Sequence, residues 1–304
     1  MRYMVLHWPR LSDSLLLSLR PRVRQVELLL NSEPVGVLDV ILGEAGRFDR
    51  LLFHLALTDQ QKLPVGKSNL LLSLRRRGIN LWNADLPDLS KHQIQRWNRK
   101  LNLPSTASQA LGSDEELLIV KTRFNAFADT ESQLNREERA ILGYPMSWSN
   151  PIDEWNQYPV LHRCDVPAAW WKSNRLCIER FIENSDGAFA RIFLVGQSVV
   201  ICSSRSKRKI KRLDKAFQVN QLLLERRNSA EPDFANLLSH RLFGALKSAV
   251  RFADAIGLDY GAIDIVFDES LSYIVDVNPT PQWGPFLDPV TKAHLIKGMQ
   301  GIYE

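Results

Sequence analysis

Residues 261–268 read Gly-Ala-Ile-Asp-Ile-Val-Phe-Asp, and residues 273–281 read Tyr-Ile-Val-Asp-Val-Asn-Pro-Thr-Pro. Apolar and β-branched residues dominate both segments and a short polar stretch separates them, which predicts two strands paired as a hairpin. Asp264 stands inside the first strand, between two isoleucines. Asp276 and Asn278 are two residues apart on the second strand, so their side chains are expected on the same face.

An acidic side chain inside a buried strand needs a partner. Burying a carboxylate costs several kcal/mol unless it is paired or bound to a metal. Two readings of Asp264, Asp276 and Asn278 are open. In one, their oxygens hold Mg²⁺, which prefers carboxylate and carbonyl oxygens. In the other, Asp264 pairs with an arginine while Asp276 and Asn278 shape the following turn.

Helices and strands alternate through the preceding sequence. A helix that ends at a glycine and is followed by an apolar strand is typical of an α/β lobe. No role can be assigned to residues 1–30, and loops with short helices are expected over 129–160. The predicted strands cover 35–42, 79–82, 117–121, 175–181 and 190–202, and the predicted helices cover 48–57, 70–77, 91–101 and 234–256.

The composition is that of a folded globular protein. The chain has 304 residues, of which 45% are hydrophobic and 24% charged, values that argue against disorder along the whole length. The longest uncharged apolar stretch, 192–204, is shorter than the roughly 18 residues that a membrane-spanning helix needs. A cytoplasmic protein without a membrane anchor is therefore expected. The three cysteines are widely spaced, which predicts reduced thiols instead of a disulfide framework.

A basic run accounts for much of the net charge of +5, because residues 205–212 contain six cations. Such a run can be a solvated loop, a contact with nucleic acid, or a clamp for phosphates and carboxylates. No aromatic side chain is interleaved with these cations for stacking on bases, so binding to nucleic acid is the least favoured of the three. We expect a mobile loop that closes over an anionic ligand.

The segment around Asp264, Asp276 and Asn278 resembles the metal-binding strands of the ATP-grasp superfamily. In that family an aspartate is followed along the chain by Glu-x-Asn and usually a proline; here Asp276 replaces the commoner glutamate. The resemblance spans roughly residues 78–281 and implies an ATP-grasp fold of the α+β / α/β class. It would have an N-terminal α/β lobe over 1–103, a small central lobe over 104–182, and a C-terminal lobe with the metal site over 183–304.

The resemblance also implies a nucleotide pocket for ATP with Mg²⁺, or with Mn²⁺ in its place. Lys91 at a helix start and Lys121 at a strand end match the two phosphate-binding lysines, and a lysine ending a buried strand can direct its ammonium at a phosphate. The segment 178–183 resembles the hinge that binds adenine. There Glu179 would face the amino group and Glu183 the ribose, with Asp186 as an alternative ribose ligand. The hinge positions between the two glutamates are Arg180, Phe181 and Ile182.

Two arginines are candidates for the reacting centre. Arg191 is similar to an arginine of the glutamate-ligase branch of the family and would hold an acyl-phosphate, and Arg205 is a further candidate; both are equally compatible with exposed strand positions. Two departures from the family pattern stand out. Residues 122–135 contain no glycine, where most members have a glycine-rich lid, and Ala262 occupies a position where some members carry an arginine.

The implied activity is ATP-dependent ligation of a carboxylate to an amine, on small molecules or peptides, through an acyl-phosphate. The alternative is an ATP-grasp nucleotide-binding protein without ligase activity, either a regulator or a phosphotransferase. The substrates cannot be read from the sequence, and a homo-oligomer is left open.

Overall fold

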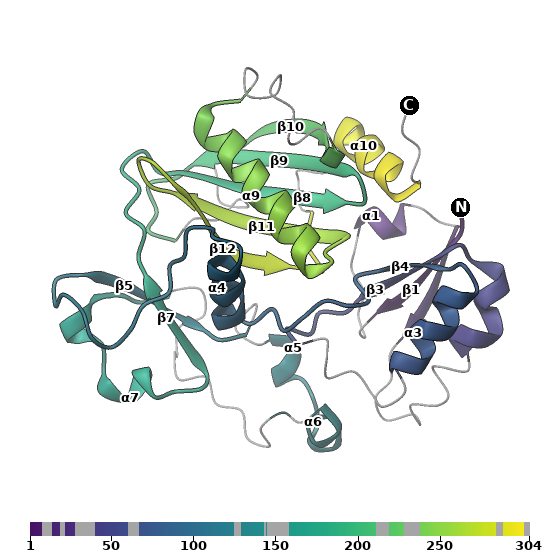
Figure 1. Ribbon diagram of the computed structural model, residues 1–304, viewed down its shortest axis with the longest axis horizontal. Helices are drawn as coiled ribbons and strands as arrows, with labels where there is room; N and C mark the ends of the chain where they lie inside the picture. The colour runs from purple at the N-terminus through teal and green to yellow at the C-terminus, as the bar shows by residue number, and fades with distance from the viewer. Residues whose placement is uncertain are drawn as a thin grey trace.

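The computed structural model describes residues 1–7, 14–18, 22–27, 40–59, 67–124, 129–142, 144, 158–210, 219–227, 238–283 and 288–300. Three sheets organise this part of the chain, and Figure 1 shows them as three regions around the helix α4 (Lys91–Lys100). The first sheet is parallel and the other two are antiparallel, as the fold class expected from the sequence requires.

The first sheet has strand order β2-β1-β3-β4. Side chains on both of its faces are buried, Met4 and Leu51 toward one apolar cluster and Val5 and Leu52 toward another. Its elements are β1 (Tyr3–His7), α1 (Ser14–Leu17), β2 (Val23–Glu27), a 3-10 turn (Ala45–Arg47), β3 (Arg50–His54), α3 (Lys67–Arg76) and β4 (Asn80–Trp82). The segment 1–30, unassigned from the sequence, thus supplies two strands.

Two predictions in this region are wrong. The segment 48–57, expected to be helical, contains β3, because a strand buried on both faces shows a continuous apolar run that imitates helical spacing. Residues 40–42, expected in a strand, are helical, and the rest of that predicted strand, 35–39, lies outside the described residues. The helix before Gly78 and the strand after it are confirmed, with Gly78 at φ 75°.

The second sheet is small and has strand order β6-β5-β7. Its core is a cluster that includes Leu118, Val120 and Ile178. The elements of this region are β5 (Leu117–Thr122), α5 (Asp129–Ser132), α6 (Arg136–Leu142), β6 (Val160–His162), a 3-10 turn (Arg163–Asp165), α7 (Ala168–Trp171) and β7 (Leu176–Arg180). The strand that ends near Lys121 is confirmed.

The third sheet has strand order β10-β9-β8-β11-β12. Its elements are β8 (Ala188–Val195), β9 (Ser198–Arg205), β10 (Val219–Glu225), α9 (His240–Ile256), β11 (Tyr260–Phe267), β12 (Ser272–Asn278) and α10 (Pro289–Gln300). The helix α9 covers one face, where Leu246 and Val250 pack against Ile263 and Ile265. On the other face α10 and the first sheet pack, so that Leu52 shares a cluster with residues of β8 and β11.

The helix α9 begins later than the apolar spacing predicts. Its N-cap is Ser239, whose hydroxyl accepts a hydrogen bond from the Leu242 N–H, and residues 234–237 lie outside the described part. Its end at Gly257, with φ 72°, is confirmed, since glycine adopts the left-handed conformation without a steric penalty.

A buried asparagine joins the first sheet to the third. Asn83 follows β4, and its amide Nδ2 donates to the Tyr260 carbonyl at 2.7 Å. Its Oδ1 accepts from the N–H groups of Asp259 and Tyr260, and its own N–H donates to the Asp259 carboxylate. These bonds fix the start of β11 next to the chain that leads into α4.

Candidate functional site

Three charged side chains stand in a row across β8, β11 and β12. Arg191 lies directly opposite Asp264, and Asp264 lies directly opposite Asp276. Because directly opposed residues on neighbouring strands share a face, all three point to the same side of the sheet. Asn278 is opposite Ala262 and joins that side. The pairing shifts by one residue after Asp264, so that Asp276 is opposite Asp264 whereas Ile274 is opposite Ile265. The shared face predicted for the acidic cluster is therefore present.

Arg191 makes a two-pronged ion pair with Asp264. Its Nε and Nη2 lie 2.6 and 2.7 Å from the two carboxylate oxygens. The structure thus shows the pairing of Asp264 with an arginine that was one of the two readings of the sequence. About a quarter of each side chain is exposed, 26% for Arg191 and 29% for Asp264, so the pair borders on solvent.

Lys91, the first residue of α4, reaches the same row from another layer. Its Nζ lies 2.8 Å from Asp276 Oδ1, and only 2% of its side chain is exposed. Burial by itself would lower the pKa of Lys91, but the Asp276 carboxylate, together with Tyr158 and Glu179, outweighs it and raises the pKa above its usual range. The ammonium is therefore charged at neutral pH, with one carboxylate as its close partner.

Lys121 forms the second buried ion pair, with Glu179 on the neighbouring strand β7. Its Nζ lies 2.9 Å from Glu179 Oε2, and the exposed fractions are 9% and 1%. The Glu179 carboxylate also acts on the Lys91 ammonium. The two lysines predicted to bind phosphates therefore converge on one region from different layers of the molecule.

A thiol completes this arrangement. Cys177 lies opposite Lys121 across the β5–β7 pair, and its Sγ is 3.5 Å from Glu179 Oε1. Burial raises the pKa of the Cys177 thiol well above its ordinary value, and the Glu179 charge adds to the effect. The thiol is thus neutral and serves as a weak donor to the carboxylate.

The predicted hinge residues follow directly. The backbone N–H of Arg180 donates to the Thr106 carbonyl at 2.7 Å, and that of Phe181 to the Leu117 carbonyl at 2.9 Å. Phe181 and Ile182 are half-buried and Glu183 is exposed. The Glu179 side chain, by contrast, turns inward to Lys121.

Asp186 and Arg205 stand apart from this group. Asp186 accepts hydrogen bonds from the Ala188 N–H and from Arg241 on α9, and these bonds lower its pKa. Arg205 ends β9 opposite Ala188, whereas Arg191 is opposite Cys202. Strand alternation therefore places Arg205 on the opposite face of the sheet from Arg191. The structure does not bring Arg205 to the acidic row.

Asn278 has a second contact that bears on its role. Its Oδ1 accepts from the Thr280 N–H at 2.9 Å, which shapes the turn after β12. That amide oxygen and the carboxylate oxygens of Asp264 and Asp276 are of the kind that a hard cation prefers. Within the described residues no three His, Cys, Asp or Glu side chains gather into a ready-made metal cluster, so a metal here would rely on two carboxylates, an amide oxygen and the ligand.

Sequence reasoning missed Gln95 and Asn98 on α4. Together with the predicted Lys91 they form a buried polar face of this helix. Both amides donate to the Ile274 carbonyl of β12, at 3.2 and 3.0 Å. Spacings of four and three residues place such side chains on one helical face, so the pattern was available in the sequence.

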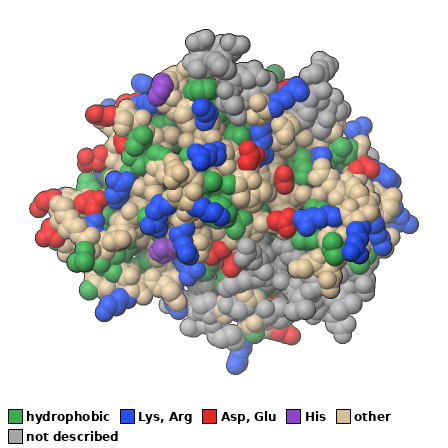
Figure 2. Space-filling view, in the orientation of Figure 1, with side chains coloured by type: hydrophobic (Ala, Val, Ile, Leu, Met, Phe, Trp, Pro, Cys, Tyr) green, Lys and Arg blue, Asp and Glu red, His purple; other side chains and the backbone are tan. Residues whose placement is uncertain are grey.

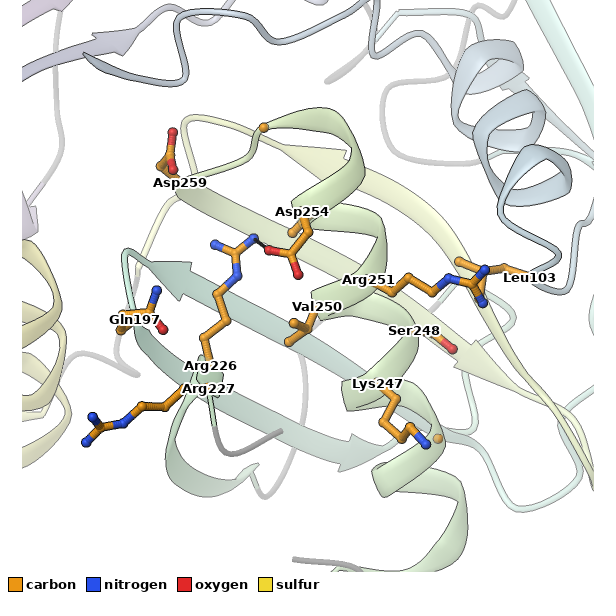
Figure 3. Close-up of a pocket in the computed structure, with 13 residues that line it drawn as sticks. Leu103, Gln197, Arg226, Arg227, Lys247, Ser248, Val250, Arg251, Asp254 and Asp259 are labelled. Atoms are coloured by element: carbon orange, nitrogen blue, oxygen red, sulfur yellow. Dashed lines mark ion pairs between the residues drawn. The ribbon is translucent and has the colours of Figure 1, made fainter. Parts of the chain in front are cut away.

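A large groove lies elsewhere on the molecule. It has a volume of about 930 Å³ and is lined by α9 and by turns near Gln197, Arg226 and Gly257. Figure 3 shows the Arg226–Asp254 ion pair inside it, with a distance of 2.6 Å. None of the site residues predicted from the sequence lines this groove.

The basic run is only partly described, since residues 211–218 lie outside the structure's described ranges. On the face shown in Figure 2, Lys and Arg side chains are interspersed with acidic ones instead of forming one basic field. Among the described residues, no helix is both long and apolar enough to cross a membrane.

A scan of protein-family models and a search of curated proteins both find no match. Solved structures do match. A RimK domain ATP-grasp protein from Sphaerobacter thermophilus is 12% identical, with a TM-score of 0.50 and 98% of each chain covered. A RiPP-associated ATP-grasp ligase from Chryseobacterium gregarium, in complex with ADP and a leader and core peptide, is 10% identical, with a TM-score of 0.50 and 100% of this chain and 98% of that one covered.

The ATP-grasp ligase PsnB, complexed with a minimal precursor, is 12% identical, with a TM-score of 0.51 over 97% of this chain and 98% of that one. At such identities the likeness concerns the fold and not the chemistry. The match nevertheless runs over nearly the whole length of each chain, so on this chain it takes in the parallel sheet and both antiparallel sheets described above. This chain has the ATP-grasp fold.

Proposed function

We propose that the protein binds Mg-ATP between its second and third sheets and uses it to join a carboxylate to an amine. One observation carries this proposal: Lys91, Lys121, Asp264 and Asp276 converge from α4, β5, β11 and β12, and each cation is paired with an acid. Phosphates and metal ions are the ligands that such cations and acids bind.

The Lys91 and Arg191 ion pairs would be exchanged when the nucleotide binds. Lys91 would turn from Asp276 to phosphate oxygens, whereas Lys121 would stay paired with the buried Glu179 and donate its other N–H groups to the phosphates. The oxygens of Asp264, Asp276 and Asn278 are the candidate ligands for Mg²⁺, which would neutralise charge on the transferred phosphoryl group. Arg191, released from Asp264, would hold the acyl-phosphate.

The hinge supplies the contacts for the rest of the nucleotide. Adenine requires an apolar slot with a few fixed hydrogen-bonding groups. The N–H groups of Arg180 and Phe181 already donate within the chain, so the candidates for those bonds are the carbonyls of Arg180 and Phe181 and the backbone of Ile182. The exposed Glu183 is the candidate for the ribose. Glu179 would not contact adenine; it would hold Lys121, with which it is paired.

The reaction we propose has two steps. A carboxylate oxygen of the substrate attacks the γ-phosphorus of ATP, the bond to the bridging oxygen breaks, and ADP leaves. An amine nitrogen then attacks the acyl carbon, inorganic phosphate leaves with the bonding electrons, and the nitrogen loses a proton to solvent. The protein positions and neutralises the reactants, and no side-chain nucleophile is required.

Peptides are the first substrates to test, because two of the structurally similar proteins are described with a precursor or a leader and core peptide. The experiment is a screen for ADP release with Mg-ATP and amino acids, short peptides or other carboxylates, each with and without an amine. We expect continuous release of ADP over many turnovers only when both a carboxylate and an amine are present, because a carboxylate alone can complete only the first step and then leaves the acyl-phosphate in the site.

A second candidate is a nucleotide-binding protein without ligase activity. It is favoured by the absence of glycine from residues 122–135, where a flexible lid would need it. Binding of Mg-ATP without ADP release for any carboxylate and amine pair would select this candidate over the ligase.

A further inference from the structure

A buried threonine contacts the carboxylate that holds Lys121. Thr106 lies in the segment between α4 and β5, with 1% of its surface exposed. Its hydroxyl donates to Glu179 Oε2 at 2.7 Å, the same oxygen that accepts from Lys121 at 2.9 Å. The next residue, Ala107, pairs with Glu179 through an isolated β-bridge. Thr106 is therefore attached to Glu179 by side chain and by neighbouring backbone.

The two oxygens of Glu179 have different surroundings. Oε2 receives one charged donor and one hydroxyl donor, whereas Oε1 meets only the weakly donating Cys177 thiol among the described residues. A strong hydrogen bond to one oxygen limits rotation of the carboxylate. Without the Thr106 hydroxyl, Glu179 could turn within its site, and the Lys121 ammonium would follow it.

Thr106 is itself held on both sides. Its N–H donates to Gln95 Oε1 at 3.0 Å, and its carbonyl accepts from the Arg180 N–H at 2.7 Å. Gln95 in turn donates to the Ile274 carbonyl, two residues before Asp276. The threonine is thus fixed relative to α4, β7 and β12, which are the elements that carry Lys91, Glu179 and Asp276.

We propose that Thr106 is a positioning residue for phosphate binding, which orients Glu179 so that Glu179 places the Lys121 ammonium. This inference rests on the proposed function. The phosphate chain is the ligand concerned, because Lys121 is one of the two lysines proposed to contact it and the carboxylate that pairs with Lys121 is the one that Thr106 contacts. The threonine itself would not touch the nucleotide.

The test compares Thr106→Val, which removes the hydroxyl at nearly constant volume, with Thr106→Ser, which retains it. Titration calorimetry with Mg-ATP and with adenosine gives the dissociation constants. Loss of one hydrogen bond to a charged group predicts roughly tenfold weaker ATP binding by Thr106→Val. Adenosine binding should be unchanged, and Thr106→Ser should bind ATP as the unmodified protein does. If thermal unfolding shows that Thr106→Val does not fold, Thr106→Ala is used in its place, because it also lacks the hydroxyl.

A double-mutant cycle separates positioning from general stability. In the Lys121→Met background, Thr106→Val should weaken ATP binding no further, because the ammonium through which Thr106 acts is gone. Equal losses for ATP and adenosine, failure of serine to rescue, or additive effects with Lys121→Met would overturn the inference. If the unmodified protein binds no ATP, both this inference and the proposed function fail; if it binds ATP and Thr106→Val does too, only this inference fails.

Discussion

Replacing Lys121 by methionine is expected to lower the free energy of unfolding by about 3–5 kcal/mol, because it leaves the Glu179 carboxylate buried without its ion-pair partner. Glu179 is only 1% exposed, so water cannot take the place of the ammonium. Denaturant unfolding followed by circular dichroism measures the loss. The same variant should bind ATP far more weakly while binding adenosine as before, since only the phosphates lose a contact.

The control variant for this prediction also removes the charge of the partner, Glu179. Lys121→Met combined with Glu179→Gln should recover most of the lost stability, because an amide in place of the carboxylate leaves no buried charge. Thr106 can still donate to the amide oxygen. ATP binding should stay weak in the combined variant. A combined variant as unstable as Lys121→Met alone would show that the loss comes from packing and not from the unpaired charge.

Asp276→Asn is expected to abolish the dependence of ATP binding on Mg²⁺. Even outer contacts of a metal site change affinity by roughly 10–100-fold, so losing a direct ligand should weaken Mg-ATP binding by at least that much. Without Mg²⁺, Asp276→Asn should strengthen ATP binding instead of weakening it. Asp276 is the close partner of Lys91, at 2.8 Å, so its neutralisation releases the ammonium for phosphate.

The measurement is calorimetry of Asp276→Asn with ATP in Mg²⁺ and in chelator. In chelator, Asp276→Asn should bind ATP as tightly as the unmodified protein does, or more tightly. In Mg²⁺, it should bind ATP much more weakly than the unmodified protein does. Asp268→Asn is a matched control, because Asp268 is an acid near the same hairpin whose contacts are with Tyr273 and the turn residues. If Asp276→Asn weakens ATP binding equally in both conditions, the metal-ligand role is wrong.

Much of the fold was predictable where one face of an element is buried. The hairpin β11–β12 follows from alternation around Asp264, and the ends of α3 and α9 follow from Gly78 and Gly257. The strand β3 was mispredicted for the opposite reason, since both of its faces are buried and its apolar residues therefore show no period of two.

Several of the predicted site residues lie together in the structure, whereas Asp186 and Arg205 lie apart from them, and the pairing was not predictable. Lys91, Lys121, Asp264 and Asp276 stood out by their positions in strands and helices. Which cation meets which acid depends on the register between β8, β11 and β12 and on the placement of α4, which the local sequence does not contain. Thr106 was missed because its partner lies 73 residues away and its own segment has no regular structure.

Titration of the unmodified protein with ATP, in the presence of Mg²⁺ and then of chelator, tests the central claim most directly. The account predicts saturable binding of one ATP per chain that is clearly tighter with Mg²⁺, because the phosphates would meet both lysines while the metal meets Asp264 and Asp276. Absence of ATP binding in both conditions, or equal affinity with and without Mg²⁺, would contradict it.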